Sequence, residues 1–168
     1  AFKDGELLLS DGERLRVDAV LVGIGVKPRT ALAKAAGLAV EDGVVVDACL
    51  RASARDVFAA GDIASYPHAD GLARVEHWVH AERQGQHAAD NMLGAAKPFD
   101  VPPFFWTHHF GTDLRHVGHG RGWTSLEVEG SPADGDCLVR YFKDGSLIAA
   151  ATIGRDQALL EIEAAMSR

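Results

Sequence analysis

The sequence predicts a mixed α/β chain, α+β overall, in which covered parallel strands and helices precede an antiparallel sheet with a terminal helix packed on it. Three observations predict this arrangement. Short apolar runs without alternation, such as Val44 to Val46, are typical of strands covered on both faces. A long stretch rich in Ala, Glu, Arg and Gln follows Glu76 and predicts a helix. After Pro103, strand-like runs lead to a last segment whose apolar residues have helical spacing.

Length and composition allow one domain or two small ones. The chain has 168 residues, of which 47% are apolar, and this is enough for a real hydrophobic core. No apolar run approaches the roughly 18 residues that a membrane-spanning helix needs. Residues 1–18 lack the layout of a signal peptide. We therefore expect no membrane association and a cytoplasmic location.

Charge and cysteine content exclude two further classes of function. The formal net charge is −7 and no basic run interrupts it, so binding to nucleic acid is not expected. Cys49 and Cys137 are far apart and form no C-x-x-C motif, which argues against a redox dithiol and a thiolate metal cluster. Both are expected to be small core residues.

The first elements are a hairpin and a strand. Glu6 to Ser10 and Arg14 to Asp18 are strand-like runs around the turn signal Asp11-Gly12. The segment from Asp18 to Gly25 is apolar on both faces and predicts a strand in a covered sheet.

A short helix and a buried strand are expected next. Pro28 and Thr30 are placed to start a helix that continues over Ala31 to Ala36, and Gly37 stops it. The run Val44 to Val46 then predicts a buried strand.

Gly23 and Gly25 do not form a dinucleotide-binding fingerprint, because the third glycine and the phosphate-facing helix start are missing. Two interpretations are open. The glycines let the backbone turn out of a strand, or the missing Cβ at Gly25 lets a flat ring lie against the backbone.

The stretch from Asp56 to Met92 organises the rest of the chain. Its apolar run Val57 to Ala60 stops abruptly at Gly61-Asp62, which predicts a buried parallel strand that ends at a functional edge. A helix is expected from Glu76 through Asn91, with its N-terminus directed at the same edge. His80 and His87 are expected to be partly exposed on that helix.

The segment from Gly94 to Pro103 contains three prolines and predicts an ordered linker, which divides the chain into residues 1–97 and 98–168. Asp144-Gly145 predicts a hairpin between the last two strands of the second part. The expected strands and final helix of this part are Phe104 to Phe110, Leu114 to Gly118, Leu126 to Glu129, Cys137 to Lys143, Leu147 to Ile153 and Asp156 to Met166.

Four motifs at this order and spacing carry a family resemblance: D-V-F-A-A-G-D at 56–62, R-V-E-H-W-x-x-A at 74–81, N-M-L-G at 91–94 and F-F-W at 104–106. The chain resembles the FAD-dependent pyridine nucleotide-disulfide oxidoreductases. Within them it is most similar to apoptosis-inducing-factor-like proteins and to the ferredoxin or rubredoxin reductases of oxygenase systems. The resemblance covers nearly the whole chain.

The resemblance implies a C-terminal portion of such a reductase, because neither of the family's G-x-G-x-x-G fingerprints occurs here. Residues 1–97 would hold the end of the NAD(P)-binding domain and the returning part of the Rossmann-like FAD-binding domain. Residues 98–168 would form the antiparallel-sheet interface or dimerisation-like domain.

The implied function is electron transfer from NAD(P)H through FAD to a ferredoxin- or rubredoxin-like acceptor, with homodimer formation left open. No catalytic side chain is implied, since the cofactor performs the chemistry. The isolated portion would show weak or no catalysis, because the adenosine half of FAD would lack its binding loop.

The resemblance also assigns the first candidate cofactor residues. Gly61-Asp62 would receive the ribityl hydroxyls of FAD, since a carboxylate offers several acceptor positions. The alternative for Asp62 is an ordinary helix-capping or turn residue.

The remaining cofactor contacts are implied at the helix start and in the second part. Backbone at His77 and Trp78 would contact the flavin ring, with Glu76 and His77 near the nicotinamide. Trp106 would lie beside both rings, and Gly25 would admit the nicotinamide side. The alternatives are a buried aromatic pair at the helix start and core packing of Trp106.

Other chemistries are disfavoured. His108 and His109 are adjacent on an expected strand and point to opposite faces, so no metal site is expected. No serine lies in a nucleophile-elbow context, which disfavours hydrolysis. The rival to the reductase is a flavin-free interaction or dimerisation module that uses the apolar residues of F-F-W and the terminal helix.

Overall fold

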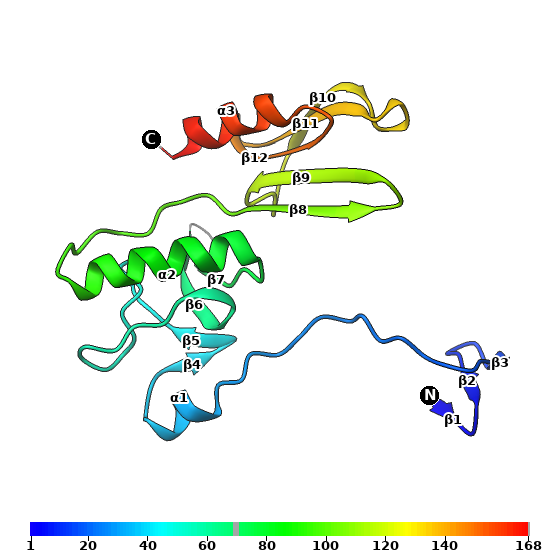
Figure 1. The fold of residues 1–168 in the computed structure, drawn as a ribbon, viewed down its shortest axis with the longest axis horizontal. Helices are drawn as coiled ribbons and strands as arrows, with labels where there is room; N and C mark the ends of the chain where they lie inside the picture. The colour runs from blue at the N-terminus through cyan, green and yellow to red at the C-terminus, as the bar shows by residue number, and fades with distance from the viewer. Residues whose placement is uncertain (69–70, 168) are drawn as a thin grey trace.

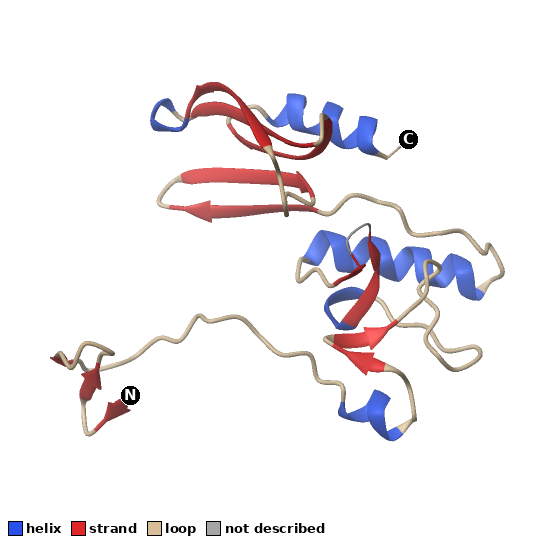
Figure 2. Cartoon of the chain, turned by 180° about the vertical axis from the view of Figure 1, so that it is seen from behind, coloured by secondary structure: helices blue, strands red, loops and turns tan. Residues whose placement is uncertain are grey.

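The computed structural model describes residues 1–68 and 71–167 of the chain. Three sheets and three α-helices follow one another along these described residues (Figure 1). A small N-terminal sheet is joined by an extended segment to a central part built around the longest helix. A five-stranded sheet and the last helix lie beyond that part, and Figure 2 shows the same order from behind.

The N-terminal sheet confirms the first predicted hairpin. Its strands are β1 (Phe2–Lys3), β2 (Glu6–Leu8) and β3 (Arg14–Arg16), and β2 pairs antiparallel with both neighbours. The turn between β2 and β3 contains Asp11, whose carboxylate accepts a hydrogen bond from the Glu13 N–H at 3.0 Å.

The prediction of a strand from Asp18 to Gly25 is wrong. Residues 17–30 contain no helix or strand, and the side chains of Leu21 and Ile24 are 99% and 88% exposed. A strand requires a neighbour for its backbone N–H and C=O groups. No strand among the described residues lies beside this segment, so its apolar pattern has no sheet to join.

The short helix and the Val44 strand are confirmed. Helix α1 (Ala31–Ala35) begins after Thr30, and the Gly37 backbone has a φ of 72° just beyond its end. A four-stranded sheet follows in the order β4-β5-β6-β7. These strands are β4 (Val40–Glu41), β5 (Gly43–Val45), β6 (Ala64–His68) and β7 (Gly71–Ala73).

The parallel strand of this sheet lies after Gly61-Asp62, not before it. Strand β6 pairs parallel with β5, with Val44 opposite Ala64. The expected strand Val57 to Ala60 is a loop that forms only single bridging contacts, such as the hydrogen bond from the Ala59 N–H to the Leu50 C=O. The side chains of Phe58, Ala59 and Ala60 pack against a buried cluster that includes Leu50 and Tyr66, and they do so from a loop and not from a paired strand.

Helix α2 (Trp78–Met92) confirms the long helix predicted after Glu76. One face of α2 is buried. The residues on it recur at helical spacing and are His80, Gln84, Ala88 and Asn91. That face lies over the first core, which consists of Val46, Leu50, Ala64, Tyr66, Ala88 and Phe99. The expectation that His80 is partly exposed is therefore wrong, since its side chain is 1% exposed.

Residues 93–103 form neither helix nor strand, as expected of the linker, but they are anchored. The Asn91 side-chain amide donates to the C=O groups of Cys49 and Lys97, and its oxygen accepts from the Lys97 N–H. Phe99 packs in the first core. The domain boundary between residues 97 and 98 stays a prediction.

The second part is the predicted antiparallel sheet with a terminal helix. Strand order is β10-β11-β12-β9-β8, and the Asp144-Gly145 turn joins β11 to β12. Helix α3 packs on this sheet around the buried side chains of Val117, Leu138, Ala150 and Leu159. The elements are β8 (Phe104–His109), β9 (Thr112–Gly118), β10 (Ser125–Ser131), β11 (Asp136–Lys143), β12 (Ser146–Ile153) and α3 (Asp156–Met166).

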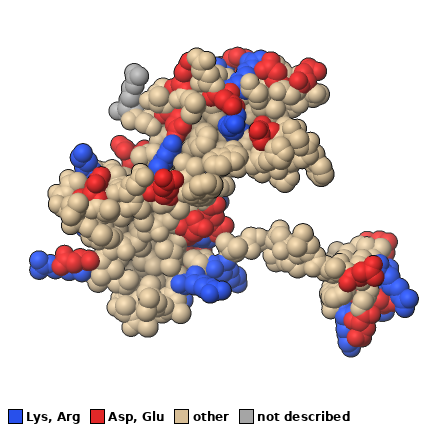
Figure 3. All heavy atoms as spheres, viewed as in Figure 1, with Lys and Arg blue, Asp and Glu red and all other residues tan. Residues whose placement is uncertain are grey.

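The two cysteines are free thiols, with Cys137 buried in the second part and Cys49 half-buried in the first. Acidic and basic side chains are interspersed on the face shown in Figure 3. Several of them are paired: Arg115 with Asp156, Arg140 with Glu129, and Arg155 with Asp136. None of the helices in the described part of the chain has the length and apolar character of a membrane span.

Candidate functional site

The turn that contains Gly61 and Asp62 packs directly against the first turns of α2. This turn is a short 3-10 helix, η1 (Gly61–Ile63), and the Gly61 N–H donates a hydrogen bond of 2.8 Å to the Gln84 Oε1. A Cβ atom on Gly61 would lie 3.2 Å from the Cβ of Ala81. The two chain segments that the sequence placed at one edge therefore meet in the structure.

Asp62 points its charge away from the core. Its side chain is exposed, and no hydrogen bond from another described residue reaches its carboxylate. Its backbone C=O accepts a hydrogen bond from the Arg74 Nη1 at 3.0 Å. The backbone is thus fixed, while the carboxylate oxygens stay available as acceptors for a ligand.

Arg74 also neutralises Glu76. Its Nη1 lies 2.5 Å from the Glu76 Oε1, and its Nε lies 3.3 Å from an oxygen of Asp42. Burial alone would lower the pKa of Arg74, but hydrogen bonds to Glu76 and Asp42 outweigh it and raise the pKa. Glu76 is therefore held in an ion pair just before the start of α2, and Arg74 shares its single positive charge between Glu76 and Asp42.

The N-terminus of α2 is open to an anionic group. His77 precedes the helix with extended backbone angles, makes no capping hydrogen bond with its side chain, and is followed by no acidic residue in the first turn. The first N–H groups of a helix have no partner inside the helix and carry partial positive charge. Burial lowers the pKa of His77, although Asp62 and Glu76 oppose this shift.

Aromatic rings from the second part flank this helix start. The His77 ring stacks on Phe105 at a centroid distance of 4.1 Å, and the rings of Trp78 and Trp106 are 5.7 Å apart. A hollow of about 90 Å³ lies among His77 to Val79 and Phe104 to Trp106. Trp78 is 73% exposed and Trp106 is 45% exposed, so neither is the buried core residue of the alternative interpretation.

Gly25 is the candidate that the structure does not bring to this place. It lies in the extended segment of residues 17–30, and a Cβ built on it would have no other atom within 4 Å. The remaining six candidates cluster on η1, the start of α2 and β8: Gly61, Asp62, Glu76, His77, Trp78 and Trp106.

Sequence reasoning missed three residues that support this cluster. Arg74 fixes the Asp62 backbone, Gln84 holds Gly61, and His80 lies beside Gln84 with its Nε2 3.2 Å from the Gln84 Nε2. The spacing of His80, Gln84 and Ala88 by four residues marks one helix face and could have indicated their burial.

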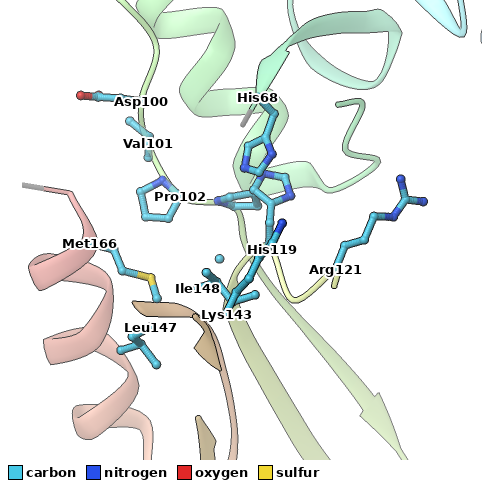
Figure 4. A pocket seen from close by; sticks show the side chains of 12 residues that line it. His68, Asp100, Val101, Pro102, His119, Arg121, Lys143, Leu147, Ile148 and Met166 are labelled. Atoms are coloured by element: carbon cyan, nitrogen blue, oxygen red, sulfur yellow. The ribbon is translucent and has the colours of Figure 1, made fainter. Parts of the chain in front are cut away.

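A second hollow, of about 310 Å³, lies between the end of β6, the linker and the second part (Figure 4). His68 and His119 face one another there with ring centroids 4.0 Å apart, and the Tyr66 hydroxyl lies 3.3 Å from the His119 Nε2. None of the candidate cofactor residues lines it. Among residues 1–68 and 71–167, no three His, Cys, Asp or Glu side chains gather as metal ligands.

Comparisons with known proteins match both parts of the chain. The family described as Pyridine nucleotide-disulphide oxidoreductase matches residues 2–85, and the family described as Reductase C-terminal matches residues 104–168. The ferredoxin–NAD(+) reductase component of the anthranilate 1,2-dioxygenase system of Burkholderia cepacia is 39% identical over 158 residues. That alignment covers 90% of this chain and 39% of the relative.

Two solved structures share the fold. The ferredoxin reductase for the CYP199A2 system of Rhodopseudomonas palustris is 32% identical with a TM-score of 0.87, over 95% of this chain and 41% of that one. Putidaredoxin reductase in its covalent complex with putidaredoxin is 30% identical with a TM-score of 0.86, and the match covers 96% of this chain and 39% of that one. The chain thus spans about two fifths of the length of these relatives.

Gly61→Ala is expected to destabilise the protein by about 1 to 3 kcal/mol, because the Gly61 backbone has a φ of 79° and the added methyl group meets Ala81. Gly85→Ala is the matched control. Gly85 is exposed within α2 with no atom near its Cβ position, so alanine should stabilise the helix by roughly 0.5 to 1 kcal/mol. Chemical denaturation measures both, and equal unfolding free energies for Gly61→Ala and the wild type would contradict the close approach.

His80 should make stability fall as the pH drops. Burial lowers the pKa of His80 from 6.5 to about 4, and His119, His77 and Arg83 add to this shift. The unfolded chain therefore binds the proton first, so the stabilising effect is complete above about pH 6.5 and is lost as the pH falls towards about 4. Denaturation at a series of pH values measures the free energy of unfolding. Between about pH 6.5 and about pH 4 this free energy should fall by up to roughly 3 kcal/mol less in a His80→Phe variant than in the wild type. Parallel curves for the two proteins would show that His80 is not held neutral.

Proposed function

Because the chain belongs to the pyridine nucleotide-disulphide oxidoreductase family, we propose that it is part of an FAD-dependent reductase that passes electrons from NAD(P)H to a ferredoxin-like acceptor. The observation that carries this proposal is the meeting of the Asp62 carboxylate with the uncapped start of α2 beside exposed tryptophan rings. The Burkholderia relative and the two solved reductases, one of them bound to putidaredoxin, support the choice of acceptor. A rubredoxin-like protein is the other expected acceptor.

The residues at the site suit a flavin in three respects. Asp62 offers unpaired acceptor oxygens for hydroxyl groups. The first N–H groups of α2 favour negative charge on a nearby ring. Trp78 and Trp106 offer ring faces, and a flat ring stacks well on such surfaces. We propose that these residues, with Gly61, Glu76 and His77, hold the isoalloxazine and ribityl parts of FAD.

The chemistry that FAD supplies when bound is acceptance of a hydride from NAD(P)H and delivery of single electrons. The first N–H groups of α2 would favour negative charge on a bound flavin ring, without requiring an acidic or basic side chain. Arg74 would support this effect, since its ion pair with Glu76 weakens the field of the nearest preceding carboxylate in the chain. Trp78 and Trp106 would cover part of a bound ring and so limit its contact with water.

The proposed site covers only part of the cofactor contacts. Gly25 would admit the nicotinamide, but its segment is exposed and contacts nothing at that position. The fingerprints that bind the adenosine halves of FAD and NAD(P)H do not occur in the sequence. We therefore propose that this chain supplies the ring and ribityl half of the flavin site.

A flavin-free interaction module remains the second candidate, favoured by exposed apolar side chains on the second part. Leu126 and Val128 on the edge strand β10 and Leu160 on α3 are 42%, 58% and 54% exposed. The visible absorption of the purified protein separates the two functions. A flavin spectrum that survives gel filtration supports the reductase, whereas a colourless dimer supports the module.

Asp62→Asn should weaken FAD binding by roughly ten- to a hundredfold, because it replaces charge-assisted hydrogen bonds while it preserves side-chain shape. Asp56→Asn is the matched control: Asp56 is also exposed, lies in the preceding loop, and has a φ of 62° that asparagine accepts. Titration of the apoprotein followed by flavin fluorescence gives both affinities. Equal affinities for the two variants would argue against Asp62 as a flavin ligand.

A further inference from the structure

Two buried polar side chains connect η1 to the start of α2. Gln84 is 0% exposed and His80 is 1% exposed, and they lie one turn apart on the buried face of the helix. The Gln84 carboxamide touches the Gly61 N–H on one side and the His80 Nε2 on the other, at 2.8 and 3.2 Å. Buried polar groups are usually hydrogen-bonded, and these two contacts satisfy the Gly61 N–H and both ends of the Gln84 carboxamide.

The chemistry of the donors fixes the orientation of every group in this chain of contacts. A backbone N–H can only donate, so the atom of Gln84 that faces Gly61 must be its oxygen. The opposite atom is then the amide nitrogen, which also only donates. The His80 Nε2 must therefore accept, and the proton of the neutral imidazole lies on Nδ1.

The surroundings of His80 keep it in this one form. The rings of Tyr66 and Phe99 lie against the imidazole with centroids at 5.5 and 5.3 Å and remove it from water, which favours the neutral ring. The Nδ1 atom has no hydrogen-bond partner within the described part of the chain, so the contact with Gln84 alone selects the tautomer. His119, His77 and Arg83 are the neighbouring groups that oppose a positive charge there. A neutral His80 with an accepting Nε2 prevents the Gln84 carboxamide from rotating.

We propose that Gln84 and His80 are positioning residues for the flavin site, in which the fixed carboxamide of Gln84 holds the Gly61 N–H and so sets the direction of Asp62 relative to the first N–H groups of α2. The inference rests on the proposed function. His80 is itself in the first turn of α2, and Gly61 immediately precedes Asp62, so the pair joins the two features that would meet the ring and its ribityl chain. Loss of either contact leaves the turn free to shift against the helix.

Nitrogen NMR of the full protein labelled at its histidines tests the hydrogen-bond assignment. Long-range proton–nitrogen correlations should show His80 neutral at neutral pH, with Nδ1 protonated and Nε2 unprotonated. Gln84→Met preserves side-chain length and removes both contacts. In this variant the Nε2 atom should become protonated in at least part of the population, and the Gly61 amide should exchange faster relative to the core amide of Val117.

Flavin affinity tests the positioning role. Gln84→Met should bind FAD roughly tenfold more weakly, and Gln86→Met, at an exposed position of the same helix, should bind it like the wild type. His80→Phe keeps an aromatic ring against Tyr66 and Phe99 and removes only the acceptor, so it remains informative if Gln84→Met fails to fold. It should weaken FAD binding several-fold and speed exchange of the Gly61 amide.

The results separate this inference from the proposed function. A wild-type protein that binds no FAD would remove the proposed function, whereas the tautomer and the Gly61 exchange rate would still report on the hydrogen-bond chain. A His80 that is charged or protonated on Nε2 in the wild type would overturn the inference. Unchanged FAD affinity in both Gln84→Met and His80→Phe would overturn it as well.

Discussion

The close approach of η1 to helix α2 is the constraint on which the candidate site depends. It requires a residue without a side chain at position 61, because a Cβ there would meet Ala81 and because the backbone has a φ of 79°. It also requires Gln84 beneath the turn, since the Gly61 N–H would otherwise be buried without a partner. Glycine at position 61 and its hydrogen bond to Gln84 together bring Asp62 close to the first turn of α2.

The second part of the chain completes the site from the opposite side. Phe105 stacks on His77 and also lies 5.0 Å from the ring of His116, while Trp106 lies beside Trp78. An ion pair of 2.5 Å between Arg83 on α2 and Glu163 on α3 joins the two parts elsewhere. Ring contacts therefore hold the aromatic side of the site against the start of α2, and an ion pair joins α2 to the terminal helix.

The charges around the site form a consistent pattern. Arg74 forms ion pairs with both Asp42 and Glu76, while His77 and His80 have pKa values lowered chiefly by burial. The carboxylate of Asp62 is left without a partner among the described residues, and the helix start is left without an acidic cap. Such an arrangement suits a ligand that presents hydroxyl groups to one side and negative charge to the other.

The sequence by itself determined those elements whose signals are local. The hairpins at Asp11-Gly12 and Asp144-Gly145, helix α2 and the five strands of the second part follow from turn residues and from side-chain periodicity within a few residues. The candidate site residues were named from the sequence through the family resemblance, which A-G-D, E-H-W and F-F-W carry because each motif is contiguous.

Only the tertiary structure decided which segments form strands and which polar groups are buried. The runs Asp18 to Gly25 and Val57 to Ala60 have strand-like composition, but pairing depends on a neighbour that no local pattern specifies. His80 and Gln84 read as ordinary helix residues, and their burial depends on Tyr66, Phe99 and Gly61 from other elements. Hydrogen bonding and burial between distant segments are non-local, which is why the support of the site emerged only from the folded chain.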